Sequence, residues 1–246
     1  MTGSRSRVRR VQGVLHRRTW LRLTGLLTLP TAWLVLVYLV PLALLFLTAF
    51  WRTDSFTGSI VRETSLDNFV DVLSNPVYLK VLARTVGLAA AVTVMCALIS
   101  LPMAFFMARV VPPRWQPLMV ALVLTPLWAS YLVKVYAWRT MLAPGGSLLQ
   151  DIFSVFGTSG PGYGWPAVVM VLTYLWLPYM VLPVYAGLAS MRGSYLDAAA
   201  DLGARPWRAF RSVVLPVLAP SVVAGSIFTF SLSLGDYITV QLVGGT

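Results

Sequence analysis

Long apolar blocks alternate with short charged segments along the chain. About 20 apolar residues are needed to cross the hydrocarbon core of a bilayer, and five blocks reach that length. Backbone polar groups must pair with one another within a membrane, so blocks of this length form helices. We predict five spans, at about 23–51, 85–108, 115–138, 165–189 and 215–236. The pattern therefore indicates an all-α membrane protein, built as a polytopic helical bundle.

Composition excludes the soluble classes of protein. Of the 246 residues, 58% are hydrophobic and 11% are charged, whereas soluble domains are about 45–50% apolar and about 25% charged. Too few charged side chains are present to cover a water-facing surface, which excludes a soluble globular enzyme. A disordered chain is excluded as well, because such chains are poor in apolar residues.

The net charge of +11 comes from basic residues between and before the apolar blocks. Seven arginines lie in residues 1–22, which we interpret as a basic cytoplasmic tail ahead of a transmembrane domain over 23–246. Basic segments beside spans stay in the cytoplasm, where they also contact anionic membrane lipid. This distribution predicts no binding to nucleic acid. It places residues 191–214 in the cytoplasm with the tail, and the C-terminus outside.

Two parts of the pattern predict finer structure. Residues 52–79 are polar and mixed in charge, so we expect a loop outside the bilayer with a short helix that begins near Ser65 or Asp67. The second span is rich in small residues, which allow helices to approach closely in lipid. We therefore expect this span to pack against other helices through small residues that include Gly87, Ala91 and Ala97.

Few side chains are available for catalysis or for binding a metal. Cys96 is the only cysteine and His16 is the only histidine, which excludes an internal disulfide and a cysteine metal cluster. Both lysines, Lys80 and Lys134, are followed by valine, whereas a P-loop requires Gly-Lys-Ser/Thr. We expect no metal and no cofactor, and any ATP that drives this protein must bind to another subunit.

The polar segment 191–214 contains signals for two short helices. Ser194 is expected to cap the first helix, with Asp197 three residues later at the spacing of a capping box. Gly203 is a natural left-handed stop, and Pro206 suits the first turn of a second helix. We expect two short helices at an angle, which insert into the groove of a partner protein.

This segment resembles part of a known family. Residues 197–204, Asp-Ala-Ala-Ala-Asp-Leu-Gly-Ala, followed by Val-Val-Leu-Pro at 213–216, are similar to the EAA loop of ABC-importer permeases. The family has Glu where this chain has Asp197. The resemblance implies that the loop couples the spans to an ATPase through Asp197, Ala198, Ala199, Gly203, Ala204, Pro206, Leu215 and Pro216.

Three further segments, 132–138, 177–183 and 234–237, resemble the spermidine/putrescine branch of this family, specifically its first permease type. The resemblance implies ATP-driven import of a polyamine by alternating access. The implied partners are a second permease subunit, a cytoplasmic dimer of ABC ATPases and an extracytoplasmic substrate-binding protein. Related branches import phosphonates, ferric iron or sulfate, and these solutes stay open as alternatives. The family also implies a sixth span, which is absent from this sequence, and a polypeptide that ends at Thr246 is not expected to transport alone.

Charged and aromatic residues near the outer ends of the spans are candidates for the translocation path, namely Lys134, Tyr136, Trp138, Asp236 and Tyr237. An ionisable residue within a span is a functional hypothesis by default. Lys134 either has a gating or pairing role or extends its amine to the membrane interface. Asp236 either attracts a cationic solute, or lies in water at a helix end, or pairs with Lys134. The aromatic residues either line a path for cations or pack against lipid and protein.

Two other classes of membrane protein compete with the importer. A membrane-embedded enzyme needs a catalytic cluster, but the only histidine lies in the tail and the acids of segment 191–214 form no set of metal ligands. A secondary transporter or channel that works without ATP needs coupling charges in its spans, where only Lys134 and Asp236 qualify. Only the importer requires an ATPase partner, so co-purification separates these classes.

Overall fold

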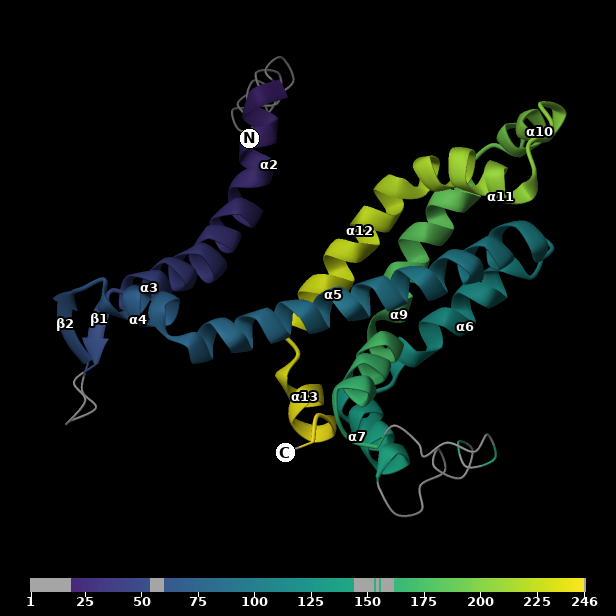
Figure 1. The fold of residues 1–246 in the computed structure, drawn as a ribbon. Coiled ribbons are helices and arrows are strands. Elements are labelled where there is room, and N and C mark those ends of the chain that lie inside the picture. The colour runs from purple at the N-terminus through teal and green to yellow at the C-terminus, as the bar shows by residue number, and fades with distance from the viewer. Residues whose placement is uncertain (1–18, 54–59, 144–152, 154, 156–161, 246) are drawn as a thin grey trace, which may run out of the picture. The chain divides into compact units, whose positions relative to one another are not determined.

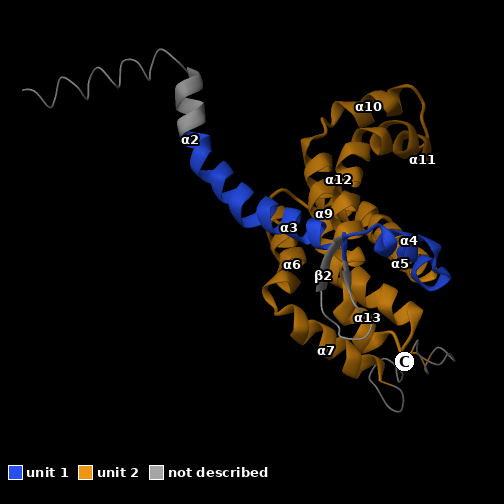
Figure 2. Ribbon diagram, turned by 90° about the vertical axis from the view of Figure 1, so that its left-hand side faces the viewer, with its two compact units in different colours: residues 1–79 blue, residues 80–246 orange. Residues whose placement is uncertain are grey.

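The computed structural model describes residues 19–53, 60–143, 153, 155 and 162–245. The chain divides into two compact units, Met1–Leu79 and Lys80–Thr246, which Figure 2 draws in different colours. Apart from one short hairpin, the described residues outside turns are helical, which confirms the expectation of an all-α polytopic membrane protein.

The first unit contains an apolar helix, a hairpin and a short amphipathic helix. The apolar helix consists of α2 (Thr19–Leu34), the π-helical turn η1 (Val35–Leu39) and α3 (Val40–Thr48). The wide turn η1 lies just before Pro41, where proline removes a donor from the regular helical bonding pattern. Residues Leu26–Thr48 are long and apolar enough to cross a membrane, as the sequence predicts for the first span.

The described residues of the polar segment that follows this helix contain two strands and a helix, where the sequence predicted a loop with a short helix. Strands β1 (Trp51–Thr53) and β2 (Ile60–Thr64) pair as an antiparallel hairpin. Helix α4 (Asp67–Ser74) comes next, and the backbone N–H of Asp67 donates to Ser65 Oγ at 3.0 Å. The predicted short helix near Ser65 or Asp67 is confirmed, whereas the hairpin was not predicted.

The second unit is a helical bundle (Figure 1). It takes in most of α5 (Pro76–Phe105), which continues as the π-helical turn η2 (Phe106–Val110). Its other elements are α6 (Gln116–Trp128), α7 (Tyr131–Leu142), α9 (Trp165–Ser190), α10 (Ser194–Asp201), α11 (Pro206–Ala209), η3 (Phe210–Val214), α12 (Leu215–Leu234) and α13 (Tyr237–Val243).

The third predicted span is not one straight helix. Segments Pro76–Val110, Trp165–Ser190 and Pro206–Leu234 can each cross a membrane, but α6 and α7 form a pair that bends by 87°. The span predicted over 115–138 is therefore two helices that together are long and apolar enough to cross a membrane, with a break between them. Helix α6 ends where Ala129 and Ser130 leave the helical conformation, with ψ of 142° and 136°. The apolar pattern alone does not record this change of direction.

Helix α9 lies at the centre of the core. It contacts α12, α6, α13, α7 and η2, and it has buried residues along its length, from Ala167 to Leu188. Figure 1 shows α9 and α12 side by side. Glycine allows this close approach: a Cβ at Gly225 on α12 would lie 2.6 Å from Met180 Sδ on α9. A Cβ at Gly187 on α9 would likewise collide with Ser221 on α12.

The small residues of the second span contribute less to packing between helices than expected. Gly87 on α5 is exposed, and a Cβ there would meet nothing within 4 Å, so the prediction that Gly87 packs against a helix is wrong. Ala91 and Ala97 are half-buried, and Ala97 packs against the core. The buried stripe of α5 instead follows helical spacing through Val92, Cys96, Ser100 and Ala104.

Candidate functional site

The segment 191–214 forms the two short helices that the sequence predicts, joined by a turn at Gly203. Gly203 has φ of +73°, a left-handed conformation that glycine adopts without steric cost. Its N–H donates to the Ala200 carbonyl at 2.8 Å, and the Ala204 N–H donates to the Ala199 carbonyl at 2.9 Å. These two bonds define a Schellman motif. The predicted left-handed stop is therefore confirmed, and Pro206 begins α11 as predicted.

The start of α10 differs from the prediction. Ser194 is the first helical residue rather than the cap, and the N-cap position is taken by Gly193, which has no side chain to accept a hydrogen bond. The Gly193 carbonyl accepts from the N–H of Leu196 at 2.9 Å and of Asp197 at 3.3 Å, so the first turn closes one residue earlier. The expected capping box is wrong. Asp197 still lies in the first turn, where a carboxylate complements the helix dipole.

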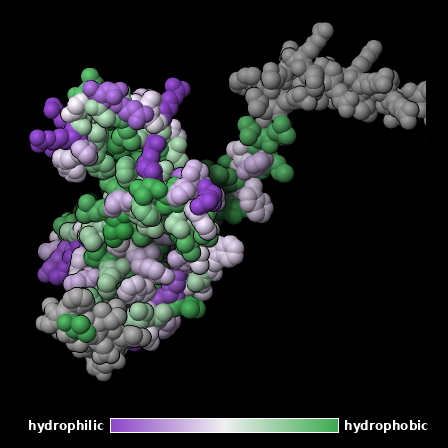
Figure 3. All heavy atoms as spheres, turned by 90° about the vertical axis from the view of Figure 1, so that its right-hand side faces the viewer, coloured by the Kyte–Doolittle hydropathy of each residue, from purple (hydrophilic) through white to green (hydrophobic). Residues whose placement is uncertain are grey.

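The outer surface of this segment combines apolar and basic side chains. Ala199 is the only buried residue of α10, while Leu202 is 89% exposed and Trp207 is 71% exposed. Trp207 stacks on Phe210 with ring centroids 5.8 Å apart, and Phe210 packs against the core. Figure 3 shows hydrophilic side chains at the upper end of the molecule, where α10 and α11 lie. Exposed large apolar residues beside charged ones are typical of an interaction surface.

The other residues of the predicted coupling set lie on or beside this surface. Asp197 and Ala198 are exposed on α10, and Ala204 is half-buried after the turn. Pro206, Leu215 and Pro216 are exposed, at the starts of α11 and α12. The structure therefore gathers the whole predicted set at one end of the bundle.

Sequence reasoning missed Arg109, which lies at the same end. Its Nη2 donates to the carbonyls of Leu188, at 3.0 Å, and Met191, at 2.7 Å. These carbonyls are at the C-terminal end of α9, directly before α10. Arginine near a helix C-terminus is favourable, but no local pattern connects residue 109 with residues 188 and 191.

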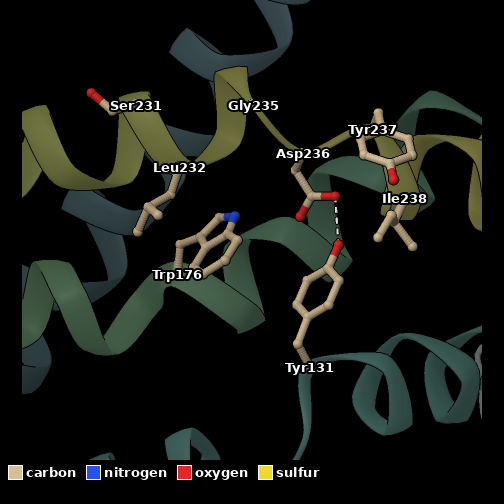
Figure 4. Close-up of a pocket in the computed structure, with 8 residues that line it drawn as sticks. All are labelled: Tyr131, Trp176, Ser231, Leu232, Gly235, Asp236, Tyr237 and Ile238. Carbon is tan, nitrogen blue, oxygen red and sulfur yellow. Dashed lines mark hydrogen bonds between the residues drawn. The ribbon is translucent and has the colours of Figure 1, made fainter. Parts of the chain in front are cut away.

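A second group of functional candidates surrounds Asp236, between α12 and α13. Tyr131 on α7 donates its O–H to Asp236 Oδ1 at 2.6 Å (Figure 4). The same oxygen accepts from the Thr239 N–H at 2.9 Å, and the Thr239 hydroxyl donates to Oδ2 at 3.1 Å. Asp236 is therefore the N-cap of α13, in agreement with the alternative that it lies at a helix end. Its hydrogen bonds go to Tyr131 and Thr239 rather than to Lys134.

A cavity of about 350 Å³ lies beside this carboxylate. Its lining includes Tyr131, Trp176, Asp236 and Tyr237, and Figure 4 shows Asp236 between the rings of Trp176 and Tyr131 on one side and Tyr237 on the other. The rings of Tyr131 and Trp176 are stacked with centroids 6.2 Å apart. A carboxylate next to aromatic faces is a favourable environment for a cation.

A second cavity, of about 330 Å³, shares Asp236 with the first. Arg84 of α5 lines it, so its charge is mixed. The hydroxyl of Ser233, also in its lining, is buried and has no hydrogen-bond partner among the residues that the structure describes. The two cavities therefore differ in character: the first presents carboxylate and rings, and the second adds a guanidinium.

The remaining path candidates lie apart from these cavities. Lys134 and Tyr136 are on α7, where Lys134 is half-buried and Tyr136 is 51% exposed. Trp138 packs against Tyr174, with ring centroids 5.4 Å apart, and lines an apolar cavity of about 600 Å³. Of the five candidates, only Asp236 and Tyr237, which are neighbours in the sequence, line the same cavity. No cluster of three potential metal ligands occurs in the described ranges.

Comparison with known proteins agrees with this architecture. The family described as binding-protein-dependent transport system inner membrane component matches residues 100–246. The chain is 40% identical to the inner membrane ABC transporter permease protein YdcU of Escherichia coli, over 98% of this chain and 81% of that protein. It is 30% identical to the spermidine/putrescine transport system permease protein PotB of Haemophilus influenzae, over 87% of this chain and 75% of that protein.

The fold is also similar to that of a solved transporter. A crystal structure of a bacterial ABC transporter involved in the import of the acidic polysaccharide alginate matches with a TM-score of 0.70 and 15% sequence identity. The match covers 96% of this chain and 81% of that chain.

The chain therefore belongs to the family of binding-protein-dependent transport system inner membrane components. It is an ABC transporter permease subunit, a multi-pass protein of the bacterial inner membrane. The resemblance to ABC-importer permeases and to the spermidine/putrescine branch, seen first in residues 197–204 and 234–237, is confirmed.

Proposed function

We propose that this chain is one permease subunit of an ATP-driven importer and that segment 191–214 couples it to a dimer of cytoplasmic ATPases. The proposal rests on the hydrogen-bonded turn at Gly203, beside which Leu202 and Trp207 are exposed at one end of the bundle. Exposed apolar side chains beside a hydrogen-bonded turn are suited to a groove in a partner protein. The ATPase activity then belongs to the partner, because this chain has no P-loop.

Charge supports the cytoplasmic placement of this segment. Arg192, Arg205, Arg208 and Arg211 all lie in it and are exposed, and basic segments beside spans favour the cytoplasmic side. The basic tail, residues 1–22, belongs on the same side, next to anionic lipid. Figure 1 shows α11 and α13 at opposite ends of α12. Asp236, directly before α13, lines both cavities, and so the cavities face the side from which an extracytoplasmic binding protein delivers solute.

The solute that we propose is a polyamine of the spermidine/putrescine kind. Asp236 supplies negative charge beside the rings of Trp176, Tyr131 and Tyr237, which suits an alkylammonium group. The similarity to PotB points in the same direction. Arg84, in the neighbouring cavity, is the feature that an anionic solute such as sulfate or phosphonate would use instead.

Purification of the tagged protein from its native host tests the importer. In mild detergent, mass spectrometry is expected to find an ATPase, a second permease and a binding protein with this chain. ATP hydrolysis by the complex should rise when the solute-loaded binding protein is added. A purified chain that takes up solute in liposomes without ATP would instead establish a secondary transporter.

Competition for uptake tests the solute. Radiolabelled putrescine should enter proteoliposomes that contain the complex, and spermidine should compete with it. Competition by sulfate or phosphonate without any effect of spermidine would contradict the polyamine proposal and leave the importer intact.

A further inference from the structure

Arg109 connects two elements that are far apart in the sequence. It lies in the last turn of η2, directly after α5, and is half-buried. Its Nη2 donates to the carbonyls of Leu188 and Met191 at 3.0 and 2.7 Å. A helix C-terminus leaves carbonyls unpaired and carries partial negative charge. The guanidinium therefore supplies both a donor and a positive charge to the end of α9.

This contact lies immediately before α10. Only Arg192 and Gly193 separate Met191 from the first residue of α10, Ser194. Helix α10 contacts α11 and η3, and it buries a single residue, Ala199. Its position therefore depends strongly on the two chain segments that connect it to α9 and α11.

The chain itself connects the segment to α9 on one side and to α12 on the other. Helices α11 and η3 run directly into α12, and α10 follows α9 after a short linker. Helix α5 has no such covalent connection. Arg109 provides one through hydrogen bonds, and bonds from a charged donor are about twice as strong as neutral ones.

We propose that Arg109 is a positioning residue for segment 191–214, which holds the end of α9 against the end of α5 so that a movement of α10 also moves α5. This inference rests on the proposed coupling role of that segment. Arg109 then contributes to coupling, which is measured as the amount of solute transported per ATP hydrolysed. The stability of the bundle alone does not determine this ratio.

The test uses the complete transporter, with its ATPases, second permease and binding protein, in proteoliposomes. Putrescine transported per ATP hydrolysed is measured for the wild type, Arg109→Gln and Arg109→Lys. The ratio is expected to fall about tenfold in Arg109→Gln, the size of effect that loss of a charged hydrogen bond produces. Arg109→Lys should restore part of it, because lysine keeps the charge but loses the planar donor group.

Arg114→Gln is the matched control. Arg114 lies in the turn after η2, is exposed, and lies over the ring of Trp115 at 6.0 Å. Arg114→Gln removes one positive charge five residues from Arg109, as Arg109→Gln does at its own position. It is expected to leave the amount of putrescine transported per ATP unchanged.

A distance measurement gives a second readout that does not depend on the solute. Spin labels at Pro113→Cys and Asp201→Cys, both exposed positions, report the separation of the α5 end from α10. In the wild type, the distribution of distances should be narrow in both the nucleotide-free and the vanadate-trapped state, and its mean should differ between the two states. In Arg109→Gln the distribution should broaden and the change should shrink.

Wild-type values of ratio and distance in Arg109→Gln overturn the proposal. If Arg109→Gln does not assemble, Arg109→Lys decides by the same two readouts, and wild-type values there overturn it too. Gly203→Val, measured in parallel, separates the two levels of inference. Should Gly203→Val uncouple the transporter and Arg109→Gln not, only the role of Arg109 fails; should neither uncouple it, the coupling role of segment 191–214 fails.

Discussion

Two interruptions of the helical chain lie at opposite ends of the second unit and are held in different ways. Between α10 and α11, the turn at Gly203 is closed by backbone bonds to Ala199 and Ala200, a few residues away. Between α12 and α13, Asp236 is held by a side chain 105 positions away, Tyr131. The first interruption is closed by local backbone bonds, whereas the second adds a tertiary hydrogen bond to the two local ones that Thr239 donates.

This difference suits the proposed roles of the two ends. A turn that needs no distant partner keeps its shape while the helices beside it move, as a coupling element must. A carboxylate that shares its hydrogen bonds with another helix responds when either helix moves or when a cation competes for its oxygens. The following substitutions test this contrast, in order of decreasing expected effect.

Gly203→Val should have the largest effect. Left-handed backbone costs an ordinary L-residue about 1–2 kcal/mol, and a β-branched residue tolerates it least. We expect normal membrane insertion, with uptake reduced more than tenfold because α11 no longer follows α10 at the same angle. Gly193→Ala is the control, since Gly193 has φ of −57° and open space around its Cα. Unchanged uptake in Gly203→Val would show that the turn does not couple.

Asp236→Asn should have the next largest effect. Asparagine still caps a helix, so α13 keeps its start while the cavity loses its negative charge. The apparent KM for putrescine is expected to rise about tenfold, the loss expected for one charged interaction. Asp236→Glu, which keeps the charge, is the comparison. Equal KM values for Asp236→Asn and the wild type would remove Asp236 from the cation path.

Tyr131→Phe should have a smaller effect of the same kind. The ring that stacks on Trp176 remains, and Thr239 still donates two hydrogen bonds to the carboxylate. Loss of one hydrogen bond, about 1 kcal/mol, should raise the KM for putrescine about threefold to fivefold. Tyr136→Phe, on an exposed part of α7, should leave it unchanged. A larger effect of Tyr136→Phe would place the path on the other side of α7.

Lys134→Met should have the smallest effect. Lys134 lines neither of the cavities beside Asp236, and a lysine near the end of a span can extend its amine to the interface. We expect uptake within about twofold of the wild type, as for surface substitutions in general. A loss of uptake as large as that of Asp236→Asn would assign Lys134 a gating role.

Sequence alone predicted the features that depend on neighbouring residues. Apolar length predicted the spans over 165–189 and 215–236, which the structure has as Trp165–Ser190 and Leu215–Leu234. Backbone chemistry predicted the left-handed turn at Gly203 and the helix start at Pro206. These signals are local, because a glycine or proline biases its own backbone whatever surrounds it.

Tertiary structure decided which residues meet. Gly87, Gly187 and Gly225 are all glycines within long apolar helices. Of these three, only Gly187 and Gly225 lie where a Cβ would collide with a facing helix. The bend between α6 and α7 brings Tyr131 to Asp236, and the end of α9 brings its carbonyls to Arg109. Hydrogen bonds and close packing between helices act over a few ångströms, whatever the separation along the chain. Which residues become partners therefore depends on how the helices pack, and the residues next to each partner along the chain do not show it.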